Sequence, residues 1–426
     1  ATKNIYLNGY VNNMGRADFN ANILLPLNKK WSTELLLHEE FQRNKTDFNK
    51  DGFRDQPTGS LFSAVNRWSY NDSKGLSFEF GGKMLDDDKT GGELDFKKAQ
   101  KFSSSVYGVG IDINRYEGFA KIGYIFPKTK YQSIGLQISG FHHNQDAFLG
   151  LREYKGSQNN FYSNLIYQSI IKNTNHKFRT GLSFNHDGFD ETFATANFTR
   201  DENVMGGYFE YTWQPVEKFT LVAGMRGDYN SLYGWFGTPR LNLRYEPITG
   251  TIIRVSGGRG QRTANVLAEN MGHLVSARTL NIIGEPTVPG FGLKPEVAWN
   301  KGISIDQKLK MFGRAGMISL DFYRNDFTNQ VVIDLESPQS LNIYNLDGKS
   351  FSNSFQTEIS FIPVKALDVK VAYRWFDVKT TYGGKLIDRP FTATHRAFVN
   401  LGYGIKGWKF DYTVNFVGQK RIPFTG

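Results

Sequence analysis

Oxygen-bearing side chains in one short segment have the spacing of a calcium loop. Position 6 of residues 47–58 is Gly52, where such loops turn sharply. Positions 1, 3, 5 and 9 are Asp47, Asn49, Asp51 and Asp55. Position 12 normally supplies a bidentate glutamate, but here it is Thr58. The spacing predicts a candidate Ca²⁺ site, and the alternative is a metal-free turn, which the same residue types favour.

Histidine and aspartate occur close together in two other segments. The two groups are His142 and His143 with Asp146, and His186 with Asp187 and Asp190. Imidazole and carboxylate ligands suit iron, copper or zinc. Neighbouring residues of a strand face opposite sides of the sheet, so only one of His142 and His143 is expected to share a face with the other metal ligands. The alternative is that these histidines lie at the headgroup level of a membrane protein.

The chain carries no familiar enzyme motif. It lacks the G-x-S-x-G and H-E-x-x-H patterns, and no Lys-Ser/Thr pair follows the glycines of 257–260 to complete a phosphate loop. It has no cysteine, which excludes thiolate nucleophiles and thiolate metal sites. We therefore do not expect an enzyme.

The composition indicates what kind of scaffold must position these residues. Of 426 residues, 15% are aromatic and 44 are glycine, whereas the hydrophobic fraction is only 39%. Mean hydropathy is −0.44. Disordered chains are poor in aromatic residues, and no apolar stretch is long enough for a transmembrane helix. The net charge of +10 comes from scattered residues, which does not favour nucleic-acid binding. A large β-barrel with one apolar face fits these values.

Apolar and polar residues alternate along most of the chain, as they do in β-strands. Clear examples are Phe219–Asn230, Thr238–Glu246, Val369–Trp375 and Trp408–Phe416. Many alternating segments are long enough to cross a bilayer at a tilt. Backbone groups in lipid must all be paired, so the strands must close into a barrel. The sequence therefore predicts an all-β transmembrane antiparallel barrel.

Short turns alternate with longer connections. The predicted long connections are residues 46–60, 89–104, 148–160, 192–203, 263–295 and 334–350. Short periplasmic turns and long extracellular loops are typical of outer-membrane barrels. We count about nineteen strands of an expected barrel of about 22, because single-chain bacterial barrels close with an even number. We therefore expect residues 1–426 to lack the last barrel strands.

Several segments resemble TonB-dependent outer-membrane receptors. Residues 238–270 read TPRLNLRYEPITGTIIRVSGGRGQRTANVLAEN, and residues 292–303 read GLKPEVAWNKGI. Both are similar to the middle of that family's barrel, and residues 322–334 are similar to the strand and loop that follow. Residues 142–154, 350–363 and 392–400 resemble receptors of Bacteroidetes-type bacteria.

The resemblance implies a barrel domain over residues 1–426, without the family's N-terminal plug. It also implies a place in the bacterial outer membrane, in contact with its lipid, and a TonB complex that acts through the plug. No resident cofactor is required, apart from the candidate Ca²⁺ of residues 47–58. Nucleic acid is not an expected partner.

In the resembling family, upper charges meet an anionic ligand and lumen charges meet the plug. The candidate ligand-binding residues are Arg259, Arg262, Arg278, Tyr233, Trp235, Phe236, His142 and His143. The candidate lumen residues are Arg226, Arg240, Arg244, Arg254 and Arg374. The alternatives are that the arginines neutralise acids on neighbouring strands, and that the aromatic residues form an interfacial girdle.

The resulting hypothesis is an active importer that captures a ferric siderophore, another metal chelate or cobalamin at its extracellular loops. Plug movement energised by TonB would then carry the ligand inward. One alternative is a glycan or peptide importer with a surface lipoprotein lid. The other is a passive porin or an adhesin.

Overall fold

The computed structural model describes residues 4–424. The strands are β1 (Ile5–Val11), β2 (Arg16–Pro26), β3 (Trp31–Gln42), β4 (Thr58–Asn71), β5 (Leu76–Gly92), β6 (Gly108–Ile125), β7 (Ser133–Leu149), β8 (Arg152–Ile171), β9 (Asn173–Phe193), β10 (Ala196–Val216), β11 (Phe219–Asn230), β12 (Gly234–Gly237), β13 (Arg240–Tyr245), β14 (Thr251–Arg262), β15 (Thr279–Ile283), β16 (Glu296–Met311), β17 (Arg314–Asn329), β18 (Val331–Asp334), β19 (Ser340–Asn345), β20 (Ser350–Phe361), β21 (Leu367–Tyr382), β22 (Lys385–Asp388), β23 (His395–Ile405) and β24 (Trp408–Val417). The helical turns are η1 (Lys98–Gln100), η2 (Ala268–Asn270) and α1 (Met271–Leu274). No helix in this part of the chain is long and apolar enough to cross a membrane.

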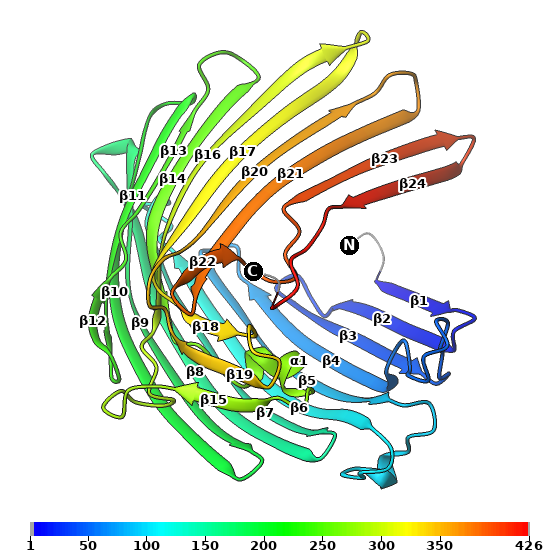
Figure 1. The fold of residues 1–426 in the computed structure, drawn as a ribbon. Coiled ribbons are helices and arrows are strands. Elements are labelled where there is room, and N and C mark those ends of the chain that lie inside the picture. Colours follow the sequence, from blue (N-terminus) through cyan, green and yellow to red (C-terminus); the bar gives the residue numbers. More distant parts are fainter. Residues whose placement is uncertain (1–3, 425–426) are drawn as a thin grey trace.

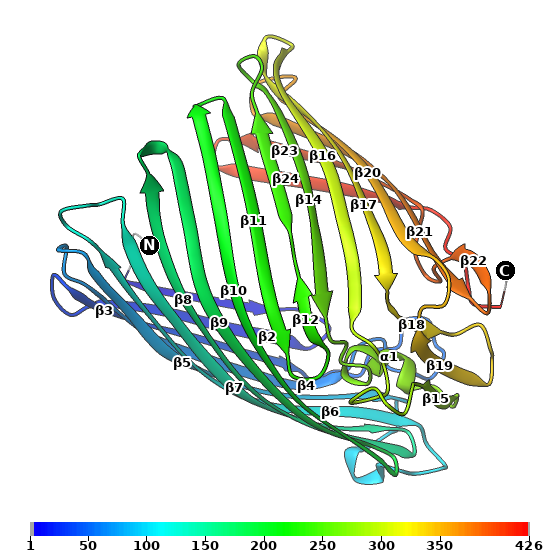
Figure 2. The same cartoon turned by 90° about the vertical axis from the view of Figure 1, so that its left-hand side faces the viewer.

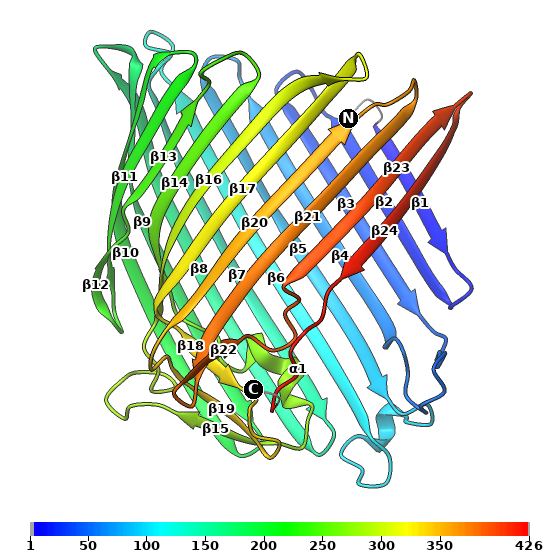
Figure 3. The same cartoon turned by 45° about the horizontal axis from the view of Figure 1, so that its top comes forward.

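Twenty-one of the strands form one sheet that curves into a barrel wall (Figure 1). Every pair of neighbours in this sheet is antiparallel, and strands adjacent in the chain are adjacent in the sheet. The short strands β12 and β22 lie beside the ends of β11 and β21, in line with β13 and β23. When β12 and β22 are counted with β13 and β23, the twenty-one strands cross the wall nineteen times. The predicted fold class and strand number are therefore confirmed. Within residues 4–424, β1 pairs only with β2 and β24 only with β23, and Figure 3 shows these two edges facing each other.

The register separates an apolar face of the wall from a polar one. One row across seven neighbouring strands is Leu221, Leu243, Val255, Ile303, Phe322, Phe355 and Trp375. The row directly next to it, on the opposite face, is Arg244, Arg254, Ser304, Asp321, Gln356 and Arg374. Because strand residues alternate, the apolar row is the outer, lipid-facing side and the polar row lines the lumen.

The two ends of the barrel differ in their connections. At one end, the turn end, strands are joined by short turns such as the single residue Lys172 between β8 and β9. At the other, the loop end, the longest connections are residues 263–295 and 330–349.

Two predicted long connections are wrong. Residues 148–160 and 192–203 are mostly strand, because β7 to β10 extend to two-residue turns at 150–151 and 194–195 (Figure 2). Gly150 and Ala194 take positive φ angles of 63° and 54°, as tight hairpin turns require. These strand ends are rich in Asn, Asp, Ser and Gly on their outer face, so their composition resembles that of a loop.

Candidate functional site

The loop end of the lumen carries a small folded unit, which we call the mouth cap (residues 263–295 and 330–349). Its two segments meet through a three-stranded sheet in which β15 runs parallel to β19 and β18 antiparallel to it. η2 and α1 lie in the first segment. In Figures 1 and 3 the cap lies within the outline of the wall at this end. The two connections therefore act as one structural element.

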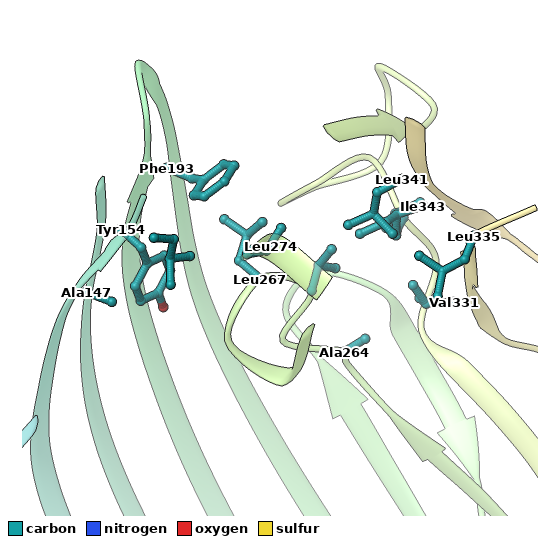
Figure 4. Packing of buried hydrophobic residues seen from close by; sticks show 13 residues of the cluster. Ala147, Tyr154, Phe193, Ala264, Leu267, Leu274, Val331, Leu335, Leu341 and Ile343 are labelled. Carbon is teal, nitrogen blue, oxygen red and sulfur yellow. The ribbon is translucent and has the colours of Figure 1, made fainter. Parts of the chain in front are cut away.

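A buried apolar cluster joins the mouth cap to the wall (Figure 4). From the cap, Leu267 and Leu274 are almost fully buried. They pack in one cluster with Ala147, Tyr154 and Phe193 from the ends of β7, β8 and β9. Burial of each leucine contributes about 1.5–3 kcal/mol. Lumen-facing residues here are apolar because the cap covers them, whereas lower in the lumen they are charged.

Hydrogen bonds hold the mouth cap to its surroundings. The Tyr107 hydroxyl donates to the Val275 carbonyl at 2.6 Å. The Arg152 guanidinium donates to the carbonyls of Leu274 at 2.7 Å and Arg278 at 3.0 Å. Leu274 is the last residue of α1 and Val275 follows it, and carbonyls at the end of a helix lack partners within the helix. Arg278 directly precedes β15. Burial raises the pKa of Tyr107, so the hydroxyl keeps the proton that it donates.

The Tyr154 hydroxyl also makes a buried contact with a carboxylate. It donates to Glu191 at 2.9 Å, and both side chains are buried beneath the mouth cap. Glu191 comes from β9, and Tyr154 from β8. A buried carboxylate is costly unless it is hydrogen-bonded, so this contact fixes the part of the wall on which the cap rests.

Five charged side chains form two ion-paired groups that line one cavity of the lumen wall next to the mouth cap, and together we call them the charged network. They are Asp187, Arg200, Glu202, Arg226 and Asp228. Arg200 lies 2.5 Å from Asp187, and Arg226 lies 2.5 Å from Asp228. Glu202 accepts hydrogen bonds from Asn230 at 2.5 Å and from Thr263, a cap residue, at 2.7 Å.

This charged network borders a cavity of about 490 Å³. Three carboxylates face two guanidinium groups, so its arginines are paired rather than free to hold an anion. Arg200 is only 8% exposed. Arg200 and Glu202 were not predicted as site residues, because both lie in residues 192–203, which were predicted to be a loop.

A larger cavity of about 970 Å³ lies between the mouth cap and the hairpin ends of the wall. Its lining includes Tyr107, Arg152, Phe193, Phe198 and Ile282. Arg278 also lines it, with its guanidinium 5.5 Å from the centre of the Phe424 ring. An aromatic and aliphatic pocket with two arginines could take a ligand that has a flat apolar part and an anionic group.

Of the three upper arginines, Arg259 and Arg262 both line the cavity of about 490 Å³, whereas Arg278 lines the cavity of about 970 Å³. Arg259 and Arg262 lie on opposite faces of β14, since they are three residues apart on a strand. Arg262 faces inward and bonds Glu269 at 2.8 Å and Glu296 at 2.7 Å. Arg259 donates to the Gly237 carbonyl at 2.6 Å. The three arginines were predicted to act together because they are close in the sequence. Alternation along β14 turns the side chains of Arg259 and Arg262 to opposite faces of the wall.

The three aromatic residues at 233–236 line one cavity of about 520 Å³ together with Arg259, but their side chains make different contacts. Trp235 is 78% exposed on the outer face, 5.3 Å from the Tyr229 ring, as an interfacial girdle residue would be. Phe236 lines the cavity of the charged network. The Tyr233 hydroxyl donates to the Leu293 carbonyl of the mouth cap at 3.2 Å.

The histidines do not form a metal centre. His142 faces outward and bonds Asn159 at 2.7 Å and Asn144 at 2.8 Å. His143, the next residue, faces the lumen. His186 also faces outward, 3.0 Å from Asn203. Across residues 4–424, no three His, Asp or Glu side chains lie together as a metal site.

The predicted lumen arginines lie on the inner face. Arg226, Arg240, Arg244 and Arg254 pair with Asp228, Glu210, Glu246 and Asp306. Arg374 donates to Ser354 at 3.2 Å and lies 4.2 Å from the centre of the Phe376 ring. This arrangement agrees with the alternative interpretation, in which arginines neutralise acids on their own and neighbouring strands.

The carboxylates of the predicted calcium loop are used within a turn. Asp47 accepts backbone N–H bonds from Asp51 at 3.1 Å and Gly52 at 3.0 Å. Asp55 accepts one from Phe48 at 2.7 Å. These contacts describe a metal-free turn of the kind that Asp and Asn favour. Calcium binding at residues 47–58 stays a prediction.

Calorimetry decides between the two interpretations of this loop. If Ca²⁺ binds, titration of the receptor with Ca²⁺ should show one binding event, which Asp51→Ala removes because it deletes a ligand oxygen. Asp72→Ala, in a turn at the other end of the barrel, should leave it unchanged. No event in the unaltered protein would contradict the calcium interpretation.

His273 in α1 predicts a pH-dependent docking of the mouth cap. Burial, and then the charges of Arg278 and Arg389, lower the pKa of His273. The docked cap therefore prefers neutral imidazole, and docking should weaken as pH falls below about 6.5, the ordinary histidine value. His273→Gln should remove this part of the dependence. The pH dependence of docking is measured by the rate at which a thiol introduced beneath the cap, Ala147→Cys, is labelled. The rates are compared at each pH with and without His273→Gln. Identical pH profiles would contradict the prediction.

The architecture defines a large antiparallel barrel of outer-membrane type, with a folded cap at one mouth. A family model described as TonB dependent receptor-like, beta-barrel, matches residues 7–424, so the chain belongs to that family of outer-membrane receptors. The loop end is therefore extracellular and the turn end periplasmic. Among curated proteins, none matches this chain.

Solved structures of receptors share the fold. The ferric enterobactin receptor of Pseudomonas aeruginosa gives a TM-score of 0.72 at 11% identity, covering 98% of this chain and 67% of that one. The alcaligin receptor of Bordetella pertussis gives 0.68 at 11% identity, covering 97% and 68%. The pyoverdine-bound receptor FpvA of P. aeruginosa gives 0.70 at 10% identity, covering 96% and 60%. Identities this low support the shared fold alone.

Proposed function

We propose that this receptor imports a scarce ligand, a ferric siderophore or another metal chelate such as cobalamin, by TonB-energised movement of a plug. The observation that carries the proposal is the mouth cap, which packs against the wall at the extracellular end of the lumen and borders a cavity large enough for such a ligand. A passive pore would need neither the cap nor the cavity. The similar solved structures include receptors for ferric enterobactin and alcaligin.

The cavity beside the mouth cap is the proposed capture site. Phe193 and Phe198 offer flat apolar contact, and Arg278 offers a guanidinium for an anionic oxygen. Arg152 is already bonded to cap carbonyls, so its role is to hold the cap in place. A ligand bound here would contact both the wall and the mouth cap, so its affinity would depend on whether the cap is docked.

The remaining partners follow from this function. TonB would act on the plug, and the inner-face arginines would line the space that the plug occupies. They are already paired with neighbouring acids, so they present a surface of low net charge to it. Ca²⁺ has no part in this scheme beyond the separate prediction for residues 47–58.

Growth of a deletion strain on single nutrient sources tests the proposal. We expect a defect on one ferric siderophore or on cobalamin as sole source, restored by the intact gene but not when TonB is removed. No defect on any metal chelate would overturn it. A defect on an oligosaccharide or peptide would indicate the other class of importer, and uptake that persists without TonB would indicate a porin.

A further inference from the structure

The outer face of β5 to β10 changes character along the strands. In the membrane belt, one row across these strands is Phe80, Ala120, Ile138, Ser163, Phe184 and Met205. Six residues farther toward the loop end, the row on the same face is Asp86, Asn114, Asn144, Ser157, Asp190 and Thr199. The upper row contains only carboxylate, amide and hydroxyl side chains.

On β10, this polar row lies above the hydrocarbon of the membrane. On β10, Trp213 marks the lower aromatic girdle on the outer face. A tilted strand crosses the hydrocarbon in about 9–11 residues, so the belt ends near Asn203. Thr199 is four residues higher, which at about 3.4 Å per residue and 45° of tilt is roughly 10 Å above the belt. Figure 2 shows these long strands as one continuous wall.

The upper wall is hollowed. A cavity of about 780 Å³ is lined by Asn114, Tyr116, Asn144, Asp190 and Asn197, among others. Tyr116 is 54% exposed. Asp146 also lines the hollow, and in the described part of the chain neither its carboxylate nor that of Asp190 has a hydrogen-bond or ion-pair partner. The hollow is therefore rich in free acceptors.

Cations are scarce in the hollow. Lys155 is the one lysine or arginine among the residues that line it, and its ammonium lies 3.2 Å from Glu153. A phosphate group would meet carboxylates there and would be repelled. An apolar chain would leave the amides and carboxylates without partners. The partner that fits has many hydroxyl donors and no negative charge in the hollow.

We propose that this hollow binds the sugar headgroup of a glycolipid in the outer leaflet. Sugar hydroxyls would donate to Asp146, Asp190 and the side-chain carbonyl of Asn144, and the apolar face of a sugar ring would rest on Tyr116. The surface continues directly from the lipid-facing belt on the same strands, so its occupant is attached to the leaflet. The proposal does not depend on which ligand the receptor imports.

Native mass spectrometry of the receptor purified from outer membranes and delipidated tests this. The two probes are lipopolysaccharide with its core oligosaccharide and lipid A without it. We expect tighter binding of the core-bearing probe. The double variant Tyr116→Ala with Asn144→Ala should weaken that probe roughly three- to tenfold, the size of one lost hydrogen bond, and leave lipid A unchanged.

The control variant is Tyr229→Ala, which removes another exposed outer-face tyrosine, on β11 and away from the hollow. It should bind both probes as the unaltered receptor does. Circular dichroism and urea unfolding confirm that each variant is folded. Equal binding of the two probes, an equal loss in the control, or a loss of binding when divalent cations are chelated would overturn the proposal. The last result would indicate cation-bridged phosphate instead.

Discussion

Leu274→Ala should open the mouth cap and expose the wall beneath it. Leu274 is 1% exposed and belongs to the cluster that joins the cap to β7, β8 and β9. Truncation of a buried leucine to alanine costs about 2.7–5 kcal/mol, which corresponds to about a hundredfold or more in the population of the open cap.

The chain has no cysteine, so a single introduced thiol reports this opening without background. The Ala147→Cys substitution places a thiol on the buried inner face of β7. We expect its labelling by a hydrophilic maleimide to be about a hundred times faster with Leu274→Ala. Leu182→Ala, on the lipid-facing side of β9, is the matched control and should not change the rate. Equal rates in all three proteins would mean that the cap is not held by this cluster.

Arg200→Met should destabilise the barrel more than substitution of an exposed arginine on the same lumen face. Arg200 is buried between Asp187 and Glu202, so its removal leaves two buried carboxylates without a counter-charge. The loss of one partner from a buried pair costs about 3–5 kcal/mol. The midpoint of urea unfolding in phospholipid vesicles, followed by circular dichroism, measures the change.

Two further variants make the Arg200 result interpretable. Arg254→Met removes an arginine of the same lumen face whose side chain is 47% exposed, and should cost no more than about 1 kcal/mol. Arg200→Met combined with Asp187→Asn should recover part of the lost stability, because one unpaired charge is removed as well. Equal effects of Arg200→Met and Arg254→Met would show that burial of the network contributes nothing.

Much of the wall was predictable from the sequence, because alternation is a local signal. The apolar residues of Phe219–Asn230 and Thr238–Glu246 identified both the strands and their outer face, and the register places Leu221 opposite Leu243. The prediction was wrong for residues 148–160 and 192–203. There the outer face lies above the membrane and is polar, so strand and loop have the same composition.

The site was less predictable, because it depends on contacts between distant segments. Arg262 and Arg278 were singled out by charge, but the cap core of Leu267, Leu341 and Ile343 comes from two connections that only the fold brings together. Arg200 lies in residues 192–203, which were predicted to be a loop, and Glu191 directly precedes them. Their burial follows from the mouth cap, which no local pattern reveals.

The parallel pairing of β15 with β19 sets an order of assembly. Thr279 pairs with Ser340, and the strands β16 and β17 lie between them in the chain. The wall hairpins close by contacts between neighbours, whereas this pairing must wait until that long intervening segment has folded back. We therefore expect the wall to form before its mouth cap. A newly inserted receptor would then expose the inner face of β7 to β9 until β15 and β19 have paired.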